Sequence, residues 1–204
     1  MTEINWPVYL GVFSASVLGA VIPAAIYVVF LWWLDRYEKE PFWLLAFAFL
    51  WGAIPANVFA LIINTALGLP LYIVAGEELG MLGTASLVAP VVEESVKGLA
   101  LLILVLLFRK EFDNVLDGII YGGMIGFGFA MTEDFDYFVR GYASGGWEGM
   151  WAIILLRPTL FGLSHAVFTS VTGAGIGLAR LSPKWSTRLL VILAAWAGAV
   201  FLHA

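Results

Sequence analysis

Three ionisable side chains lie in the middle of an apolar segment that is long enough to span a bilayer. Glu93, Glu94 and Lys97 all fall within the apolar run at about residues 84–108. On insertion scales each charged residue near the centre of a membrane helix costs roughly 2.5–3.5 kcal/mol, so such residues are expected to have a function. Lys97 follows Glu93 by one helical turn and can pair with it, whereas Glu94 lies about 100° around the helix. We therefore expect the lysine to hold one of the two carboxylates and to leave the other free.

The other apolar segments contribute further ionisable residues, including both histidines of the chain. These residues are Glu133, Asp134, His165 and His203. Two imidazoles and one carboxylate are an adequate ligand set for Zn²⁺ with water in the fourth position, and a further glutamate could accept the proton of that water. A metal-free site would need only a glutamate and a histidine to activate water, with Lys97 or an asparagine stabilising the oxyanion. The pattern is therefore compatible with a hydrolase.

The same residues also allow two other interpretations. Glu93, Glu94 and His165 could form the proton relay of a membrane transporter. Alternatively, the chain could be a catalytically inactive scaffold that only binds its partner.

The composition is that of a polytopic membrane protein. Of 204 residues, 62% are hydrophobic and 12% are charged, and the mean hydropathy is +0.95. A soluble domain does not need so much apolar surface. The modest net charge of −5 and the short clusters of bases do not favour a nucleic-acid partner. The absence of cysteine excludes disulfides and thiolate chemistry.

Apolar runs predict an all-α membrane helix bundle of about six transmembrane helices around a polar intramembrane site, as one domain over residues 1–204. The runs cover about residues 8–34, 42–67, 84–108, 115–136, 152–181 and 189–204. We expect a charged turn at residues 35–41, loops at 68–83 and 137–151, and a break in the fifth run at Arg157-Pro158. Because only Glu3 and no base precedes the first run, we expect this run to be a retained helix. The second run contains Pro55, Asn57 and Asn64, which predicts a kinked helix with an inward polar face.

Small residues at every fourth position predict close helix packing on two of these helices. One series leads to Glu133 and the other starts at His165. The small residues are Gly118, Gly122, Gly126 and Ala130 in the first series, and Thr169, Gly173 and Gly177 in the second.

The distribution of basic residues predicts the orientation in the membrane, because basic loops stay in the cytoplasm. Most bases lie in the turns after the first, third and fifth runs: Arg36, Lys39, Arg109, Lys110, Arg180, Lys184 and Arg188. We therefore expect the N-terminus outside and the polar site toward the extracytoplasmic face.

Three known hydrolase motifs are absent. The sequence has no His-Glu-x-x-His pair, no Gly-x-Ser-x-Gly elbow and no Gly-x-Gly-Asp. These absences disfavour a zincin-like site-2 protease, a serine hydrolase of the elbow type and a presenilin-like aspartyl protease.

A series of ordered motifs resembles those of PrsW intramembrane proteases. The motifs are Asp35-Arg-Tyr37-Glu-Lys-Glu40-Pro41, Glu93-Glu94-x-x-Lys97, Asp117-Gly-Ile-Ile-Tyr121-Gly, Gly128-Phe-Ala130-x-x-Glu133, His165-Ala-x-Phe-x-x-x-x-Gly173 and a final His203. The likeness covers residues 35–203. The wider clan includes the CAAX prenyl endopeptidases, which have arginine where this chain has Gly98, so the PrsW branch fits better.

The resemblance implies a membrane-embedded peptidase, similar to a metalloprotease, that makes the site-1 cut in a single-pass membrane protein such as an anti-sigma factor. It implies a bacterial or archaeal cell membrane as the location. Relatives usually continue past their last histidine with a further helix, whereas this chain ends at Ala204. Two alternatives follow: the sequence lacks a C-terminal helix, or the last site residue lies at a frayed helix end.

Roles for individual residues also follow from the resemblance. Glu93 would be the general base, Glu94 its partner, and His165 a group that binds water or metal. Glu133 and His203 would complete the site. The candidate zinc ligands are therefore His165, His203 and Glu133, with Lys97 and Asp134 as supporting residues.

Overall fold

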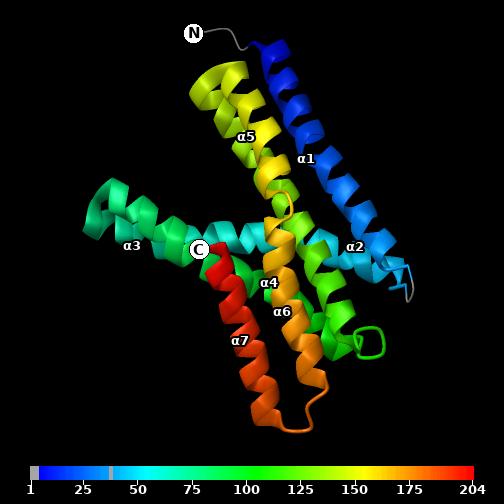
Figure 1. Ribbon diagram of the computed structural model, residues 1–204. Coiled ribbons are helices and arrows are strands. Elements are labelled where there is room, and N and C mark those ends of the chain that lie inside the picture. The colour runs from blue at the N-terminus through cyan, green and yellow to red at the C-terminus, as the bar shows by residue number, and fades with distance from the viewer. Residues whose placement is uncertain (1–4, 37–38) are drawn as a thin grey trace.

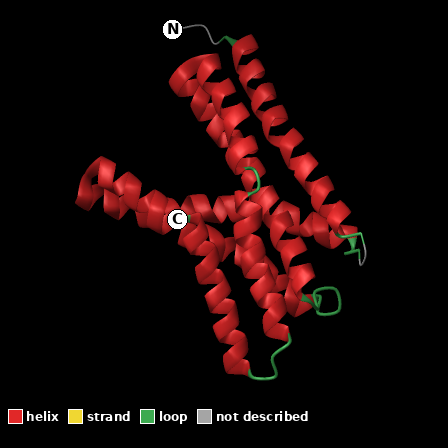
Figure 2. Ribbon diagram, viewed as in Figure 1, coloured by secondary structure: helices red, strands yellow, loops and turns green. Residues whose placement is uncertain are grey.

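The chain folds into α-helices joined by short turns, in a computed structural model that describes residues 5–36 and 39–204 (Figures 1 and 2). The helices are α1 (Trp6–Leu34), α2 (Phe42–Trp51), α3 (Asn57–Gly83), α4 (Ala89–Leu107), α5 (Val115–Phe161), α6 (Ser164–Arg180) and α7 (Trp185–His203). Two π-helical turns, η1 (Gly52–Ala56) and η2 (Thr84–Val88), flank α3. The described residues include no strand, so the predicted all-α class is confirmed. Glu3, Tyr37 and Glu38 lie outside the described residues.

Four helical stretches of the described chain are long and apolar enough to cross a membrane. They are Trp6–Leu34, Phe42–Leu107, Val115–Arg180 and Trp185–His203. Large apolar side chains cover the outer surface; Val74 and Phe201, for example, are 87% and 81% exposed. Such a surface is expected in lipid, where apolar side chains need no cover. The prediction of an integral membrane protein is thus confirmed. The predicted count of about six spans is not confirmed. Each of the two 66-residue stretches contains a reversal of the chain.

The predicted loop at residues 68–83 is wrong, because α3 continues through it and reverses at a single glycine. Gly76 has φ 83° and ψ 176°, a conformation that side chains with a Cβ atom rarely adopt. The two arms of the reversal touch, since a Cβ atom added to Gly80 would lie 2.6 Å from Tyr72 Cα. Within α3 only the glycine has non-helical dihedral angles.

The predicted loop at residues 137–151 is also helical and belongs to α5. This helix reverses at Gly145 and Gly146, of which the second has φ 60°. The first arm of α5 therefore runs from its start to the reversal, and the second arm returns toward α6, beside the first (Figure 1).

The predicted break at Arg157-Pro158 is wrong as well, because the second arm of α5 continues through the proline. The interruption comes later, before α6 begins at Ser164. The proline removes only the hydrogen bond to the carbonyl four residues earlier. The Pro158 carbonyl itself accepts the backbone N–H of Gly162 at 3.1 Å and the hydroxyl group of Tyr27 on α1 at 2.8 Å, which ties this part of the arm to α1.

Helices α5 and α6 pack through the two predicted small-residue faces. A Cβ atom added to Gly118 would lie 2.1 Å from the carbonyl oxygen of Gly173, and one added to Gly126 would lie 2.4 Å from that of His165. Close packing on these faces is thus confirmed. The antiparallel register brings Glu133 of α5 within hydrogen-bonding distance of the His165 side chain, at 2.8 Å.

A capping box and a buried carboxyl group fix the start of α5. Asn114 Oδ1 accepts the backbone N–H of Asp117 at 3.1 Å, and the Asp117 carboxylate accepts that of Asn114 at 3.0 Å. One turn later, the hydroxyl group of Tyr121 donates to the carboxyl group of Glu40, in the turn before α2. Burial and the nearby carboxylates of Asp117 and Asp35 raise the pKa of Glu40 to about 8, despite this hydrogen bond.

The π-helical turn η1 lies where α2 contacts α5. A Cβ atom added to Gly52 would lie 1.9 Å from the carbonyl oxygen of Ile125, so the two backbones are in contact. A π-turn disturbs the regular ladder of backbone hydrogen bonds. Side chains supply partners here: Asn57 donates to the Gly52 carbonyl at 2.8 Å, and Thr132 to the Ala53 carbonyl at 2.7 Å.

Candidate active site

The ionisable residues predicted from the sequence converge where α4, α5, α6 and α7 meet. Their positions are Glu93, Glu94 and Lys97 on α4, Glu133 and Asp134 on α5, His165 on α6 and His203 on α7. Five of the seven are buried, and Glu133 and His203 are partly buried. The C-terminal end of α7 reaches this place, and α7 packs against α6 and α4 (Figure 1). The structure thus gathers the whole predicted set into one polar cluster.

Lys97 holds Glu94 and not Glu93. Its ammonium group lies 2.5 Å from Glu94 Oε1, and both side chains are fully buried, at 0% exposure. Glu94 also accepts a hydrogen bond from the Thr169 hydroxyl at 3.2 Å and lies 3.0 Å from His203 Nδ1. Of the two pairings that the sequence left open, the i,i+3 pair is therefore formed.

Glu93 retains a free carboxylate oxygen inside the cluster. Its Oε1 accepts a long hydrogen bond from the Asn64 amide of α3 at 3.4 Å, whereas Oε2 is buried and has no hydrogen-bond partner. Nε2 of His203 lies 3.7 Å from Oε2, too far for a hydrogen bond. A carboxylate with an open acceptor position beside an imidazole is the arrangement that a general base needs.

His165 is held in one tautomer by two partners. Its Nε2 lies 2.8 Å from Glu133 Oε2, and its Nδ1 lies 3.2 Å from Lys97 Nζ. A carboxylate can only accept and an ammonium group can only donate. Nε2 therefore carries the hydrogen and Nδ1 presents its lone pair to the cluster. The rings of Phe129 and His203 pack against the imidazole, with centroids 5.2 and 5.0 Å away.

Arg157 holds the two carboxylates of α5. Its Nη2 lies 2.7 Å from Glu133 Oε2, and its Nε lies 2.8 Å from Asp134 Oδ1. The guanidinium group also lies over the ring of Tyr137, 3.6 Å from the centroid. Asp134 thus joins the cluster through Arg157 and does not face Glu93 directly.

Three residues of this cluster were not predicted as site residues. Asn64 was expected only to face inward, Thr169 only to be a small packing residue, and Arg157 only to mark a helix break. An arginine and an asparagine inside apolar runs were the available signals, because buried polar groups in a membrane need partners. Thr169 gave no comparable signal.

A metal ion fits a subset of the cluster. Glu93, His165 and His203 each offer a ligand atom, and these atoms lie within 4.8 Å of one another. Two imidazoles and a carboxylate with an unpartnered buried oxygen form a suitable zinc ligand set. Glu133, the carboxylate that the resemblance named as a ligand, is instead engaged by Arg157 and His165. It remains a proposed ligand with the weaker geometric support.

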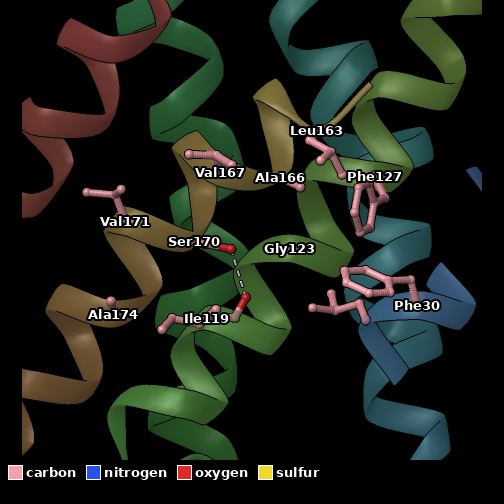
Figure 3. Close-up of a pocket in the computed structure, with 11 residues that line it drawn as sticks. Phe30, Ile119, Gly123, Phe127, Leu163, Ala166, Val167, Ser170, Val171 and Ala174 are labelled. Atoms are coloured by element: carbon pink, nitrogen blue, oxygen red, sulfur yellow. Dashed lines mark hydrogen bonds between the residues drawn. The ribbon is translucent and has the colours of Figure 1, made fainter. Parts of the chain in front are cut away.

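The apolar groove in Figure 3 contains no group that could carry out this chemistry. It has a volume of about 360 Å³, lies between α1, α5 and α6, and includes Phe30, Phe127 and Val167 in its walls. The one polar side chain in its lining, Ser170, donates its hydroxyl hydrogen to the Ile119 carbonyl at 2.8 Å. The candidate active site is therefore the polar cluster.

Comparisons with known proteins agree with the motifs. Residues 40–204 match the family described as "PrsW family intramembrane metalloprotease". The chain is similar to Protease PrsW of Clostridioides difficile (strain 630), with 35% identity over 120 residues, 59% of this chain and 49% of that protein. It is also similar to Protease PrsW of Geobacillus kaustophilus (strain HTA426), with 28% identity over 187 residues, 91% of this chain and 75% of that protein. No solved structure matches.

The first of these matches spans about half the length of the relative, and the family match spans most of the chain. The polar cluster lies within the matched residues, and its side chains come from three of the four apolar helical stretches. The family predicted from the motifs is confirmed: the chain belongs to the PrsW family of intramembrane metalloproteases.

Proposed function

We propose that the protein is an endopeptidase that hydrolyses a peptide bond inside or next to the membrane, with Glu93 as the proton acceptor. The observation that carries this proposal is the buried Glu93 Oε2, which has no hydrogen-bond partner and lies beside two imidazoles. In a cluster where the other carboxylates are engaged by Lys97 and Arg157, Glu93 is the group available to take a proton from water.

The neighbouring residues have complementary tasks in this mechanism. Glu93 would accept the proton of the attacking water and return it to the leaving amine. The ammonium group of Lys97 would stabilise the developing oxyanion. The unprotonated Nδ1 of His165 would accept a hydrogen bond from the water and orient it. Glu94 holds the ammonium group of Lys97 in place at 2.5 Å. A zinc ion, when held by His165, His203 and a carboxylate, would supply Lewis-acid polarisation of the peptide carbonyl.

The proposed substrate is a single-pass membrane protein such as an anti-sigma factor, cut in a site-1 reaction near the extracytoplasmic face. The family membership supports a membrane-protein substrate. The turns after α1, α4 and α6, which carry most of the bases, all lie away from the N-terminal end of α1 (Figure 1). This common placement supports cytoplasmic basic turns and an N-terminus outside.

The test is cleavage of a tethered single-pass substrate by protein reconstituted in liposomes. Glu93→Gln and His165→Ala should abolish the products, because they remove the base and a water-orienting imidazole. Glu148→Gln, a change of the same kind at an exposed position of α5, should cleave like the wild type. Continued cleavage by Glu93→Gln would overturn the assignment.

Metal analysis of the same preparations defines the role of zinc. We expect one Zn²⁺ per chain, lost in a His203→Ala variant, and loss of activity with a chelator. Zinc that is also lost in Glu93→Gln would identify Glu93 as a ligand and would exclude it as the free base. Full activity without bound metal would leave water activation to Glu93 and His165 alone.

A proton-coupled transporter is the second candidate, and one observation favours it. Glu133, His165, Lys97, Glu94 and His203 form an unbroken line of contacts at 2.5–3.2 Å. Such a line is also typical of a proton relay. The test is proton-coupled flux in liposomes that contain no peptide substrate. Flux that Glu94→Gln abolishes would establish this function in place of proteolysis.

A further inference from the structure

We propose that Arg157 is a positioning residue of the active site, which fixes His165 in its Nε2–H tautomer by holding Glu133 in place. The part of this proposal that concerns catalysis rests on the proposed peptidase function. The part that concerns the tautomer does not.

The contacts form a directed chain from Arg157 to the imidazole. Arg157 Nη2 donates to Glu133 Oε2 at 2.7 Å, and the same oxygen lies 2.8 Å from His165 Nε2. An arginine is always protonated, so Arg157 can only donate to Glu133. The Glu133 carboxylate then accepts from both the guanidinium group and the imidazole. The unprotonated Nδ1 of His165 then accepts from Lys97 Nζ, 3.2 Å away.

A second carboxylate makes the arginine necessary. Asp134 follows Glu133 directly, and its Oδ1 lies 2.8 Å from Arg157 Nε. Without the guanidinium group, both carboxylates would lose the donor that they share. Glu133 could then turn, and its Oε2 would no longer be held where it accepts from His165 Nε2.

The fold places Arg157 so that it can reach both acids. The acids lie on the first arm of α5 and Arg157 on the second, after the reversal at residues 145–146. The Tyr27 hydroxyl of α1 anchors the next residue by its bond to the Pro158 carbonyl at 2.8 Å. The ring of Tyr137 covers one face of the guanidinium group, which is only 22% exposed. The guanidinium group is thus fixed by Tyr27 through the backbone, by the ring of Tyr137, and by the two carboxylates that accept its hydrogen bonds.

The chain offers a simple spectroscopic test, because it contains only two histidines. Protein labelled with ¹⁵N in histidine gives two imidazole patterns in detergent, which a His203→Gln variant assigns. At one fixed pH, wild-type His165 should show a protonated Nε2 and an unprotonated Nδ1. In Arg157→Gln we expect both His165 signals to shift toward a mixture of tautomers, with much smaller changes for His203.

Kinetics provide the second readout. Orienting partners of this kind typically contribute about 10–100-fold to activity, so kcat of Arg157→Gln should fall at least about tenfold while KM changes little. Arg157→Lys keeps the charge but cannot form the two forked hydrogen bonds of the guanidinium group. Its kcat and its His165 signals should therefore lie between those of the wild type and of Arg157→Gln. Arg140→Gln is the matched control, because Arg140 forms an exposed pair with Asp136 on the same helix. It should match the wild type.

Unshifted His165 signals in Arg157→Gln overturn the proposal, whether or not activity falls. If that variant does not fold, Arg157→Lys decides in the same way, and its unshifted signals overturn the proposal. If the wild type cleaves no substrate, the proposed function fails, while the ¹⁵N signals still decide how His165 is held.

Discussion

Replacing Lys97 by methionine should destabilise the protein by about 3 kcal/mol, at the lower end of the cost of leaving one buried charge without its partner. The pair that this change breaks is fully buried on both sides, with 2.5 Å between Lys97 Nζ and Glu94 Oε1. Loss of one partner from a buried pair typically costs about 3–5 kcal/mol. Glu94 keeps two other contacts, to Thr169 at 3.2 Å and to His203 at 3.0 Å, which is why the lower end applies.

The double variant Lys97→Met/Glu94→Gln should recover at least about 2 kcal/mol of this loss, because no charge is then left buried. Unfolding free energies can be measured by titration with a denaturing detergent, since nine tryptophans report the transition. Arg140→Met is the control: its pair with Asp136 is 72% and 55% exposed, so it should cost less than about 1 kcal/mol.

A buried charge pair is refuted if Lys97→Met costs no more than the exposed control. It is equally refuted if the double variant is as unstable as the single one. Either result would mean that Glu94 is not held as a buried charge by Lys97, and the division of roles between Glu93 and Glu94 would have to be reversed.

Three further predictions concern the rest of the fold and the site. Since the pKa of Glu40 is raised from its ordinary value of 4.5 to about 8, its stabilising effect should be complete below about pH 4.5 and lost as the pH rises to about 8. This loss has a slope of at most about 1.4 kcal/mol per pH unit, which Glu40→Gln should remove from pH-dependent unfolding curves. Gly126→Ala should destabilise by about 1–3 kcal/mol, because its Cβ atom would lie 2.4 Å from the His165 carbonyl oxygen, whereas Gly145→Ala meets nothing within 4 Å and should be neutral in the same assay. Asn64→Ala should lower kcat in the cleavage assay by removing its 3.4 Å hydrogen bond to Glu93, while Asn57→Ala, which frees the Gly52 carbonyl, should lower stability more than kcat.

The helix faces and the polar set could be predicted because each leaves a periodic or costly signal in the sequence. Glycines at every fourth position indicate a close contact whatever the partner, and Gly118 and Gly126 do face the backbone of α6. Charges in apolar runs indicate a site, because a membrane helix retains them only with partners. Both signals are local, since each is contained in one segment of the chain.

The reversals and the pairings could not be predicted in the same way. One glycine at position 76 turns the chain, and it resembles many glycines that do not. The choice of Lys97 between Glu93 and Glu94 depends on the partners that α6 and α7 bring, Thr169 and His203. Arg157 was predicted only to mark a helix break, because it precedes a proline. Its partners Glu133 and Asp134 lie on the other arm of α5, so the local sequence did not indicate them. These features depend on contacts between segments, which spacing alone does not contain.

Because of the π-turn η1, the geometry of the site depends on the number of residues between α2 and α3. A π-turn holds one residue more than an α-helical turn, and each residue rotates the rest of the helix by about 100°. A deletion of a single codon within η1 would let α2 run into α3 as plain α-helix, and Asn64 would then face away from Glu93. The missing amino acid itself would touch nothing in the active site. In a mutational screen, such an in-frame loss would behave like a lesion in the catalytic centre.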